Sequence, residues 1–505
     1  MLHLWLVGFQ SLLQARELMF LGLGMMIGLF FGAIPGLGGG AALALIAPLT
    51  YGLEPFTALA LAGGVMGAVP MGGSITAILL NAPGTAPSAA TCLDGYPLAQ
   101  QGKAGLALGA AASANALGGI IGTVSVLAVL PVAKQLVLLF GPPELFLLAV
   151  LGLVIVSTSA RGKFLRGLMT GCFGLLISFI GYNDITGVLR FTGGIQYLWD
   201  GVHLVPALIG LFALAEMIQL SISGGTIAKD SRAVKITSMT SGLMETFRHW
   251  PTVLRGSLIG TVVGAIPGVG GTVASFLSYS MTARASKDPA SFGAGNIAGV
   301  IAPEAAINAK DGSCLIPTLA FGIPGGVEMA VFLGLLVLHG LQPGPLMLMN
   351  HQVEIYGLIW ALTGACILGS CMGLLLARPL ARLTLVDSQV LVPVVTAVAL
   401  LGSWAVDRSI ENVVVTAAFG ILGYLMIRFD YPRLTLVVAM VLGATAERNF
   451  HQAAIMGDGG LSIYLHRTPS LLLLVGIAGL LVSPAIRRVL GRTRNSAGLP
   501  EAAAR

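Results

Sequence analysis

Charged side chains are scarce in this sequence. Its 505 residues include 27 lysines and arginines and 21 aspartates and glutamates, so only 10% of the chain carries charge. Soluble domains carry about 25% charged residues, whereas 56% of this chain is hydrophobic and its mean hydropathy is +0.90. The shortage of charge excludes an ordinary soluble domain and predicts an all-α polytopic membrane protein.

The motifs of common enzyme chemistries are also absent. The five cysteines form no CxxC or Cys/His metal spacing, and the seven histidines include no HExxH pair. GGS at 72–74 and GDG at 457–459 superficially resemble protease motifs. The first lacks a positioned histidine base and the second lacks a second aspartate in a helix. An intramembrane enzyme is therefore kept as an alternative, but we predict no enzyme activity, no catalytic residue and no bound cofactor.

Long apolar runs fill most of the chain. A membrane-spanning helix needs roughly 20 apolar residues. Runs that approach this length occur at 18–34, 104–130, 136–156, 164–182, 202–220, 355–377, 386–406, 410–427, 434–446 and 471–489. Together with segments that glycine and proline interrupt, they predict on the order of 10 to 12 passages through the bilayer. Residues 2–13 are interpreted as a short amphipathic helix at the membrane interface.

Basic residues cluster at the ends of these runs. Short cytoplasmic loops of membrane proteins collect lysine and arginine, so we expect the C-terminus, the polar stretch 224–255 and the loop around 161–166 to be cytoplasmic. The clusters contain Arg161, Lys163, Arg166, Lys229, Arg232, Lys235, Arg248, Arg255, Arg487, Arg488, Arg492 and Arg494. Because these charges lie at span ends and outside any nucleic-acid-binding fold, nucleic acid is not an expected partner.

The longest polar stretch divides the chain into two halves. We expect a first transmembrane half at 1–220, a polar cytoplasmic connection at 221–251, a second transmembrane half at 252–490 and a flexible cytoplasmic tail at 491–505. Each half begins with nearly the same phrase, GAIPGLGGG at 32–40 and GAIPGVGGT at 264–272. Each then has a second proline–glycine break, within 72–88 and within 312–326.

The paired breaks favour a transporter. Proline and glycine interrupt helices, and matched interrupted segments in two halves indicate a transport site at the interface of two repeats. We predict that the halves form an inverted repeat whose four proline–glycine loops meet near the bilayer midplane. Close packing of helices through small residues is the alternative explanation. An anion channel is the other transport alternative, although a channel would more naturally show rings of charge or repeated filters.

Four segments resemble one known family. They are GAIPGLGGG from residue 32, AILLNAPGTAPSAATCLDGYPLAQQGKAG at 77–105, GVIAPEAAINAKDGSCLIPTLAFGIPGG at 299–326 and HGLQPGP at 339–345. In this order they resemble the large membrane subunit of the tripartite tricarboxylate transporters, the TctA family. The resemblance implies a secondary, alternating-access uptake system for a tricarboxylate or citrate-like substrate in the bacterial inner membrane. Na⁺ is the coupling ion that it implies, with H⁺ as the alternative.

The resemblance also implies partners. A small membrane subunit of the TctB type would accompany this chain, and a periplasmic solute-binding protein of the TctC type would deliver the carboxylate. The phosphate-binding pattern GxxxxGK[ST] is absent from the sequence, as expected for uptake that an ion gradient drives in place of ATP.

The proline–glycine loops could hold a carboxylate through backbone groups. A helix that restarts after a glycine-rich break points free N–H groups and its positive dipole end at the site, and hydroxyl and amide side chains add hydrogen bonds. The residues expected to bind substrate are Pro35, Gly36, Gly38, Gly39, Ser74, Asn81, Pro83, Gly84, Thr85, Ser88, Pro267, Gly268, Gly270, Gly271, Asn308, Pro324 and Gly325. Asn81 and Asn308 are also the candidate ligands of a coupling Na⁺ ion.

Acidic residues near the last loop offer a proton-coupled alternative. Glu304 and Asp311 lie with Lys310 in an otherwise apolar stretch, and ionisable groups within a membrane are functional candidates. The simpler interpretation is that either acid pairs with Lys310 at the water boundary. Asp94, which precedes a glycine, is interpreted as a turn residue.

Overall fold

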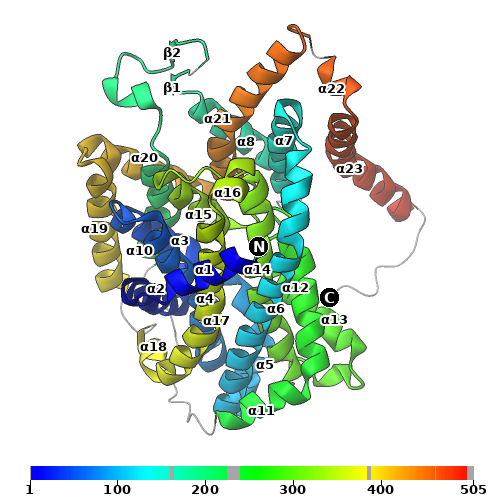
Figure 1. Ribbon diagram of the computed structural model, residues 1–505. Coiled ribbons are helices and arrows are strands. Elements are labelled where there is room, and N and C mark those ends of the chain that lie inside the picture. Colours follow the sequence, from blue (N-terminus) through cyan, green and yellow to red (C-terminus); the bar gives the residue numbers. More distant parts are fainter. Residues whose placement is uncertain are drawn as a thin grey trace.

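Helices make up nearly all of the molecule (Figure 1). The computed structural model describes residues 2–159, 164–183, 185–223, 239–383, 388–460 and 462–496, and it is 81% helical. The strands in this part of the chain, β1 (Gly181–Tyr182) and β2 (Leu189–Arg190), form one short antiparallel pair. The predicted all-α class is confirmed. The basic residues at 161–163, the middle of the polar connection at 224–238 and the end of the tail at 497–505 lie outside the described residues.

In chain order, the helices are divided at the predicted connection. The first half contains α1 (Leu2–Leu12), α2 (Ala15–Ala33), α3 (Gly38–Ile46), α4 (Pro55–Leu80), α5 (Ala89–Gln100), α6 (Ala104–Leu138), α7 (Pro142–Ser159), α8 (Phe164–Ser178), α9 (Leu204–Leu208) and α10 (Ala215–Ser223). A π-helical turn, η4 (Ile209–Leu214), joins α9 to α10, and short 3₁₀ turns are η1 (Ala47–Thr50), η2 (Ala86–Ser88), η3 (Gln196–Asp200) and, in the second half, η5 (Pro289–Ser291).

The remaining helices belong to the connection and the second half. They are α11 (Thr240–Arg248), α12 (Trp250–Gly264), α13 (Gly270–Ala285), α14 (Ala298–Phe321), α15 (Val327–Leu338), α16 (Pro345–Asn350), α17 (Gln352–Leu375), α18 (Ala377–Leu383), α19 (Ser388–Asp407), α20 (Ile410–Arg428), α21 (Arg433–Met456), α22 (Ile463–His466) and α23 (Thr468–Ser496).

The described residues include seven helices that are long and apolar enough to cross a membrane by length and composition. This is fewer than the predicted 10 to 12 passages, and shorter apolar helices such as α3, α7, α8, α15 and α23 account for much of the remaining hydrophobic sequence. One full-length helix, α4, was not predicted as a span because Pro70 and several glycines interrupt its sequence. It is continuous nevertheless, and 94% of the residues in its 18-residue apolar window are buried within the bundle.

Both copies of the first proline–glycine phrase break a helix, as predicted. In the first half α2 ends at Ala33 and α3 begins at Gly38, while in the second half α12 ends at Gly264 and α13 begins at Gly270. Gly38 and Gly270 both have positive φ angles, +58° and +77°, in the left-handed region that favours glycine. The glycine that begins the second helix of each break therefore has a left-handed backbone in both halves.

The second breaks also match. Asn81 ends α4 with φ +53°, and Gly322 ends α14 with φ +68°. In each half the glycine of the following Pro-Gly pair then packs beside the carbonyl oxygen of the glycine that opens the first phrase: Gly84 lies against Gly32, and Gly325 lies against Gly264. The two loops of each half are thereby brought together.

Glycines at four-residue spacing allow close packing of the central helix pairs. Along α2, Gly24, Gly28 and Gly32 each lie so close to a carbonyl oxygen of α4 that an added Cβ atom would overlap it. Gly256, Gly260 and Gly264 of α12 meet carbonyl oxygens of α14 in the same way. Small residues let helix backbones approach each other, so the packing alternative is correct for these glycines. The halves also interlock, because α4 packs on α17 and α14 packs on α6.

The matched halves allow a direct test of repeat orientation. Arg16 and Arg248 each lie sixteen residues before the opening glycine of their phrase, and both side chains are well exposed. In a variant without native cysteines, we expect a membrane-impermeant thiol reagent to label Arg16→Cys and Arg248→Cys from opposite sides of oriented vesicles. Labelling of both from the same side would contradict an inverted repeat.

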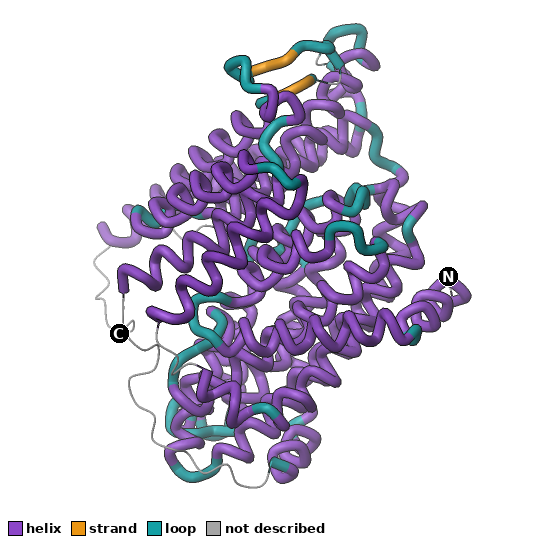
Figure 2. The backbone as a smooth tube through the Cα atoms, turned by 90° about the vertical axis from the view of Figure 1, so that its left-hand side faces the viewer, coloured by secondary structure: helices purple, strands orange, loops and turns teal. Residues whose placement is uncertain are grey.

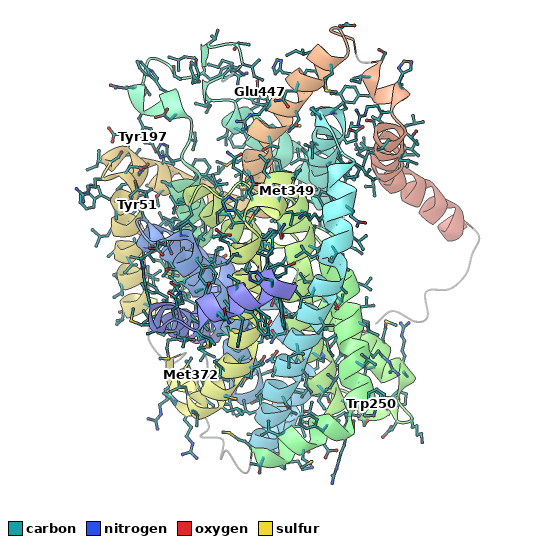
Figure 3. The ribbon with its side chains drawn as sticks, viewed as in Figure 1. Tyr51, Tyr197, Trp250, Met349, Met372 and Glu447 are labelled. Atoms are coloured by element: carbon teal, nitrogen blue, oxygen red, sulfur yellow. The ribbon has the colours of Figure 1, made fainter. Side chains whose placement is uncertain are left out.

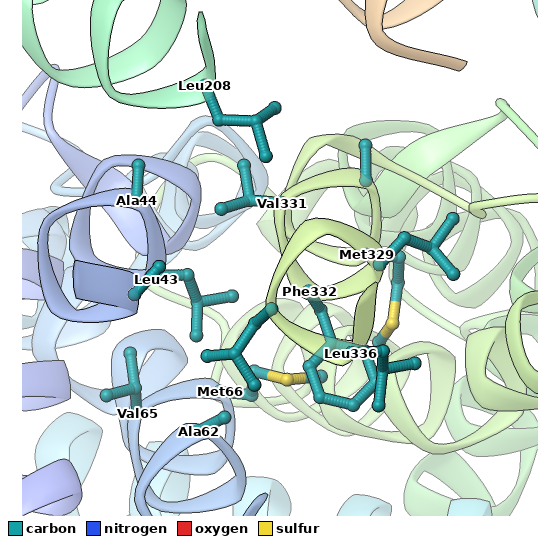
Figure 4. Close-up of a cluster of buried hydrophobic side chains, with 14 of the residues drawn as sticks. Leu43, Ala44, Ala62, Val65, Met66, Leu208, Met329, Val331, Phe332 and Leu336 are labelled. Atoms are coloured by element: carbon teal, nitrogen blue, oxygen red, sulfur yellow. The ribbon is translucent and has the colours of Figure 1, made fainter. Parts of the chain in front are cut away.

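Buried apolar side chains from both halves fill the centre of the bundle (Figure 4). Leu43 of α3, Leu208 of α9 and Phe332 of α15 are at most 2% exposed. Large apolar side chains on outer helices are instead exposed, for example Leu401 on α19 and Val414 on α20. Buried apolar side chains inside and exposed apolar side chains outside suit a protein surrounded by lipid.

The two ends of the bundle differ. Figure 2 shows the β1–β2 hairpin projecting at one end, and Figure 3 places Glu447 at that end and Trp250 at the other. Arg190 of β2 holds the hairpin to α21 through an ion pair with Glu447 of 2.6 Å. Asn183 donates a further hydrogen bond of 2.8 Å to the same carboxylate.

Candidate functional site

All four proline–glycine loops border one cavity of about 460 Å³. We call it the four-loop cavity. Its lining comprises Gly36, Leu37, Gly38, Gly39, Gly40, Ala41, Pro83, Gly84, Thr85, Ala86, Pro87, Phe212, Glu216, Gly270, Gly271, Thr272, Lys310, Gly326, Val327, Glu328, Met329 and Arg433. The residues come from both halves, so the cavity lies at the interface between them.

Three helices begin at the cavity wall. The first turns of α3, α13 and α15 lie within the lining segments 36–41, 270–272 and 326–329. The first N–H groups of a helix have no partner within that helix, and its dipole makes this end positive. These helix starts give the cavity backbone donors and a positive field, which suits an anion.

Charged side chains complete the wall. The Lys310 Nζ atom contacts the carboxylate of Asp311 and lies 4.0 Å from that of Glu328. Arg433, at the start of α21, donates to Glu216 at 2.7 Å and to the carbonyl oxygen of Leu211 at 2.8 Å. Each cation of the wall is therefore already beside an acid.

Glu328 shows how a carboxylate fits in this cavity. A Cβ atom added at Gly39, in the first turn of α3, would collide with the Glu328 carboxylate. The carboxylate thus lies beside both the N-terminal turn of α3 and Lys310. Glu328 occupies the kind of position that a substrate carboxylate would require.

The predicted residues separate into two groups. Those that line the four-loop cavity are Gly36, Gly38, Gly39, Pro83, Gly84, Thr85, Gly270 and Gly271. Those outside its lining are Pro35, Ser74, Asn81, Ser88, Pro267, Gly268, Asn308, Pro324 and Gly325. Ser88 is adjacent to the first group, because its hydroxyl lies 2.8 Å from that of Thr85.

The two predicted Na⁺ ligands have different environments. Asn81 is exposed at the end of α4. Asn308 is buried in α14, where its Nδ2 atom donates to the carbonyl oxygen of Asn115 at 2.9 Å. No group of three or more His, Cys, Asp and Glu side chains that could hold a metal ion occurs among the described residues.

The acidic residues of α14 also have different partners. Asp311 contacts Lys310, whereas Glu304 is hydrogen-bonded by Ser74 and Thr91. All of these groups are buried. Asp311 forms the pair with Lys310 that the simpler interpretation expects, and Lys310 lines the four-loop cavity. Lys310, Arg433, Glu216 and Glu328 were not predicted as substrate-binding residues. The sequence feature that could have identified such residues is a single Glu or Arg in an otherwise apolar helix.

Asp94 is not a turn residue, which corrects the prediction. It lies within α5, where it is fully buried. Its carboxylate accepts hydrogen bonds from the backbone N–H groups of Gly293, Gly295 and Asn296, all at 2.8 to 2.9 Å, and from the hydroxyl of Tyr279 at 2.8 Å. Asp94 therefore ties the first half to the loop that precedes α14.

A second, larger cavity of about 620 Å³ lies beside the hairpin. Its lining includes Tyr182, Trp199, Asp200, His203 and Asp407, and none of the four proline–glycine loops. His203 lies 2.9 Å from Asp407. Among the described residues, its lining contains the acids Asp200 and Asp407 and no lysine or arginine, so this cavity is the weaker candidate for an anion.

These features define a class of protein: a multi-pass α-helical membrane protein whose interrupted helices surround one charged cavity between two halves. The model of the family described as "Tripartite tricarboxylate transporter TctA family" matches residues 18–438. The chain therefore belongs to the TctA family, and this membership supports the role of a tricarboxylate transporter subunit over that of an enzyme.

Two relatives from Agrobacterium vitis are similar to the chain. The "Uncharacterized 52.8 kDa protein in TAR-I ttuC' 3'region" is 32% identical over 491 residues, which cover 95% of this chain and 96% of the relative. The "Uncharacterized protein in TAR-II ttuC' 3'region" is 31% identical over 210 residues, which cover 41% of this chain and 85% of the relative. No solved structure matches.

Proposed function

We propose that this chain is the large membrane subunit of a secondary, cation-coupled carboxylate uptake system, and that the four-loop cavity binds the carboxylate. The observation that supports this proposal is the convergence of all four proline–glycine loops, with Lys310 and Arg433, on one cavity. The family supports a tricarboxylate or a related small anion as the substrate class.

Binding requires that the anion exchange water for protein donors. An ionised carboxylate is costly to dehydrate unless fixed donors replace the water. In the four-loop cavity the first turns of α3, α13 and α15 offer N–H groups, and Lys310 offers a charge-assisted donor. A substrate carboxylate would take the place of Glu328 beside Lys310 and Gly39, so that binding frees one acidic side chain in the wall.

Cation coupling follows from the charge of the substrate. Moving an anion into a negative-inside cell costs about 2.3 kcal/mol per charge per 100 mV, and co-transported cations offset this cost. We propose Na⁺ as the coupling ion and alternating access between the two halves as the mechanism. The cavity at the interface of two halves with matched broken helices supports alternating access.

The proposed assembly is tripartite and lies in a bacterial inner membrane, with the C-terminus in the cytoplasm. A small membrane subunit would accompany the chain, and a periplasmic binding protein would capture the substrate. The described loops include no separate soluble domain that could bind a scarce anion by itself, and the connection between α8 and α9 holds only the β1–β2 hairpin and η3.

A reconstitution experiment tests the proposal. In proteoliposomes that contain this chain and its small membrane partner, we expect labelled carboxylate to enter at low concentration only when the binding protein and an inward Na⁺ gradient are both present. Internal unlabelled carboxylate should exchange with external label, since a carrier gives counterflow. Passive flux without counterflow would favour the channel alternative, and equal uptake with and without the binding protein would contradict the tripartite scheme.

A further inference from the structure

A fully buried carboxylate lies on the same helix as Lys310 of the four-loop cavity. Glu304 of α14 has no exposed surface. The hydroxyl oxygen of Ser74 lies 2.7 Å from both of its carboxylate oxygens, and that of Thr91 lies 2.5 Å from one of them. The ion pairs found in the described part of the chain give Glu304 no lysine, arginine or histidine. A buried negative charge without a cationic partner is strongly unfavourable.

Two buried amide oxygens lie nearby without donors. Asn115 of α6 is fully buried, and its side chain neighbours the Glu304 carboxylate. Asn308 follows Glu304 by one helical turn on α14 and donates to the carbonyl oxygen of Asn115. Within the described structure the Oδ1 atoms of Asn115 and Asn308 both lack a hydrogen-bond partner. Buried acceptors normally find a partner, so these two atoms have lone pairs free to coordinate a ligand.

The Ser74 hydroxyl cannot satisfy all of the acceptors around it. The Ser74 oxygen lies 2.8 Å from the carbonyl oxygen of Pro70 as well as 2.7 Å from Glu304. A serine hydroxyl has only one hydrogen, so it cannot donate to both acceptors at once. The Ser74 hydrogen therefore leaves either the Pro70 carbonyl oxygen or the Glu304 carboxylate without it.

We propose that a Na⁺ ion binds at this place. The side chains that contribute, named together the Glu304 cluster, are Ser74, Thr91, Asn115, Glu304 and Asn308. Carboxylate, hydroxyl and amide oxygens are the ligands that hard cations take. One carboxylate balances one positive charge, which favours a monovalent ion over a divalent one. A proton on Glu304 would neutralise the charge but could serve only one of the two unpartnered amide oxygens.

The Glu304 cluster replaces Asn81 in the predicted cation site. It keeps Asn308 and adds groups from α4, α5 and α6. The ion would thus be held by three helices of the first half and one helix of the second. A site of this kind binds more tightly when the two halves are together.

The cluster shares structural elements with the four-loop cavity. Thr91 lies one turn after Ser88, whose hydroxyl contacts Thr85 of the cavity wall. Glu304 lies six residues before Lys310 on the same helix. A cation in the cluster therefore fixes loop 83–88 from one side while a carboxylate contacts it from the other. The role of coupling ion rests on the proposed transport function, whereas binding of Na⁺ does not.

Na⁺ binding is measured on the purified full-length chain without substrate. The midpoint of thermal unfolding is followed as NaCl replaces choline chloride at constant ionic strength, and bound radioactive sodium is counted in parallel. We expect Na⁺ to raise the midpoint in a saturable manner, because a ligand that binds only the folded state stabilises it. Glu304→Gln should abolish the response, and Thr91→Val should raise the half-saturating Na⁺ concentration about tenfold.

Glu17 provides a matched control. Its carboxylate is also buried, and it accepts a hydrogen bond of 2.8 Å from Thr57, but it lies outside the cluster. Glu17→Gln and Thr57→Val should keep the Na⁺ response of the unmodified chain. If Glu304→Gln does not fold, Thr91→Val and Asn115→Ala still test the site.

The results separate the site from the transport function. Absence of a saturable Na⁺ response, or an equal response in Glu304→Gln, would overturn the proposal. The unfolding midpoint could instead depend on pH but not on Na⁺, with this pH dependence lost in Glu304→Gln. That result would identify a proton site and would also overturn the proposal. Na⁺ binding without any carboxylate counterflow would instead refute the proposed function and leave the Na⁺ site standing.

Discussion

Lys310→Gln should reduce carboxylate uptake about 100-fold. Removal of one partner from a buried, hydrogen-bonded charge pair costs several kcal/mol, and about 1.4 kcal/mol corresponds to a factor of ten. The Lys310 ammonium is the cation that lies beside the first turn of α13 as well as Glu328. Uptake into proteoliposomes is the measurement, with the amount of inserted protein determined in the same preparation.

A second variant separates binding from folding. Lys310→Gln alone leaves the buried Asp311 without its cation, which could destabilise the protein. In Lys310→Gln/Asp311→Asn both charges are removed at similar volume, so we expect abundance to recover while uptake stays low. Arg16→Gln is the matched control, since it removes an exposed ion pair with Glu54. Normal uptake by the double variant would exclude Lys310 from the substrate site.

Valine at Gly38 or Gly270 should abolish uptake and leave the protein in the membrane. Both glycines have positive φ angles, and a Cβ atom at either would meet nothing within 4 Å. A β-branched residue is a strong outlier at positive φ, so the helix starts would shift and their N–H groups would no longer line the cavity. Uptake and membrane abundance are measured together for each variant.

Two other glycines act as references for this prediction. Gly52 has φ +83° and open space around it but lies outside the cavity, so Gly52→Val introduces the same strain without touching the site. Gly84 differs, because a Cβ atom there would overlap the carbonyl oxygen of Gly32. Gly84→Val should therefore lower abundance as well as uptake. Full uptake by the Gly38 and Gly270 variants would mean that the loops serve packing alone.

The helix breaks could be predicted because their causes are local. Proline removes a backbone donor, and glycine permits positive φ, so GAIPG interrupts a helix wherever it is placed. Pro70 shows the limit of this reasoning. It lies inside α4, which stays helical because α2 and α17 pack along it and bury nearly the whole helix. Tertiary packing overrides local preference there.

The buried charged side chains depend on contacts between residues that are far apart in the sequence. Arg433 meets Glu216 across 217 positions of sequence, and Ser74 meets Glu304 across 230. Neither pairing has a periodicity or spacing that could be recognised in a single sequence. Asp94 was misinterpreted for a related reason: its Asp-Gly pair is typical of turns, but burial against the loop before α14 holds it in a helix.

The interlocked glycines make each central helix pair mechanically stiff. The contacts of α2 with α4, and of α12 with α14, recur every four residues, which is about 6 Å along a helix. If either helix slid by less than that spacing, Cα hydrogens would overlap carbonyl oxygens. Each helix pair is therefore held in one register. The breaks at 34–37 and 265–269 lie directly beyond these closely packed helices, and we expect bending to occur there because glycine restricts the backbone least. We therefore expect each helix pair to move as a rigid unit about a break that lies next to the four-loop cavity. A small rotation at the break would change the wall of this cavity.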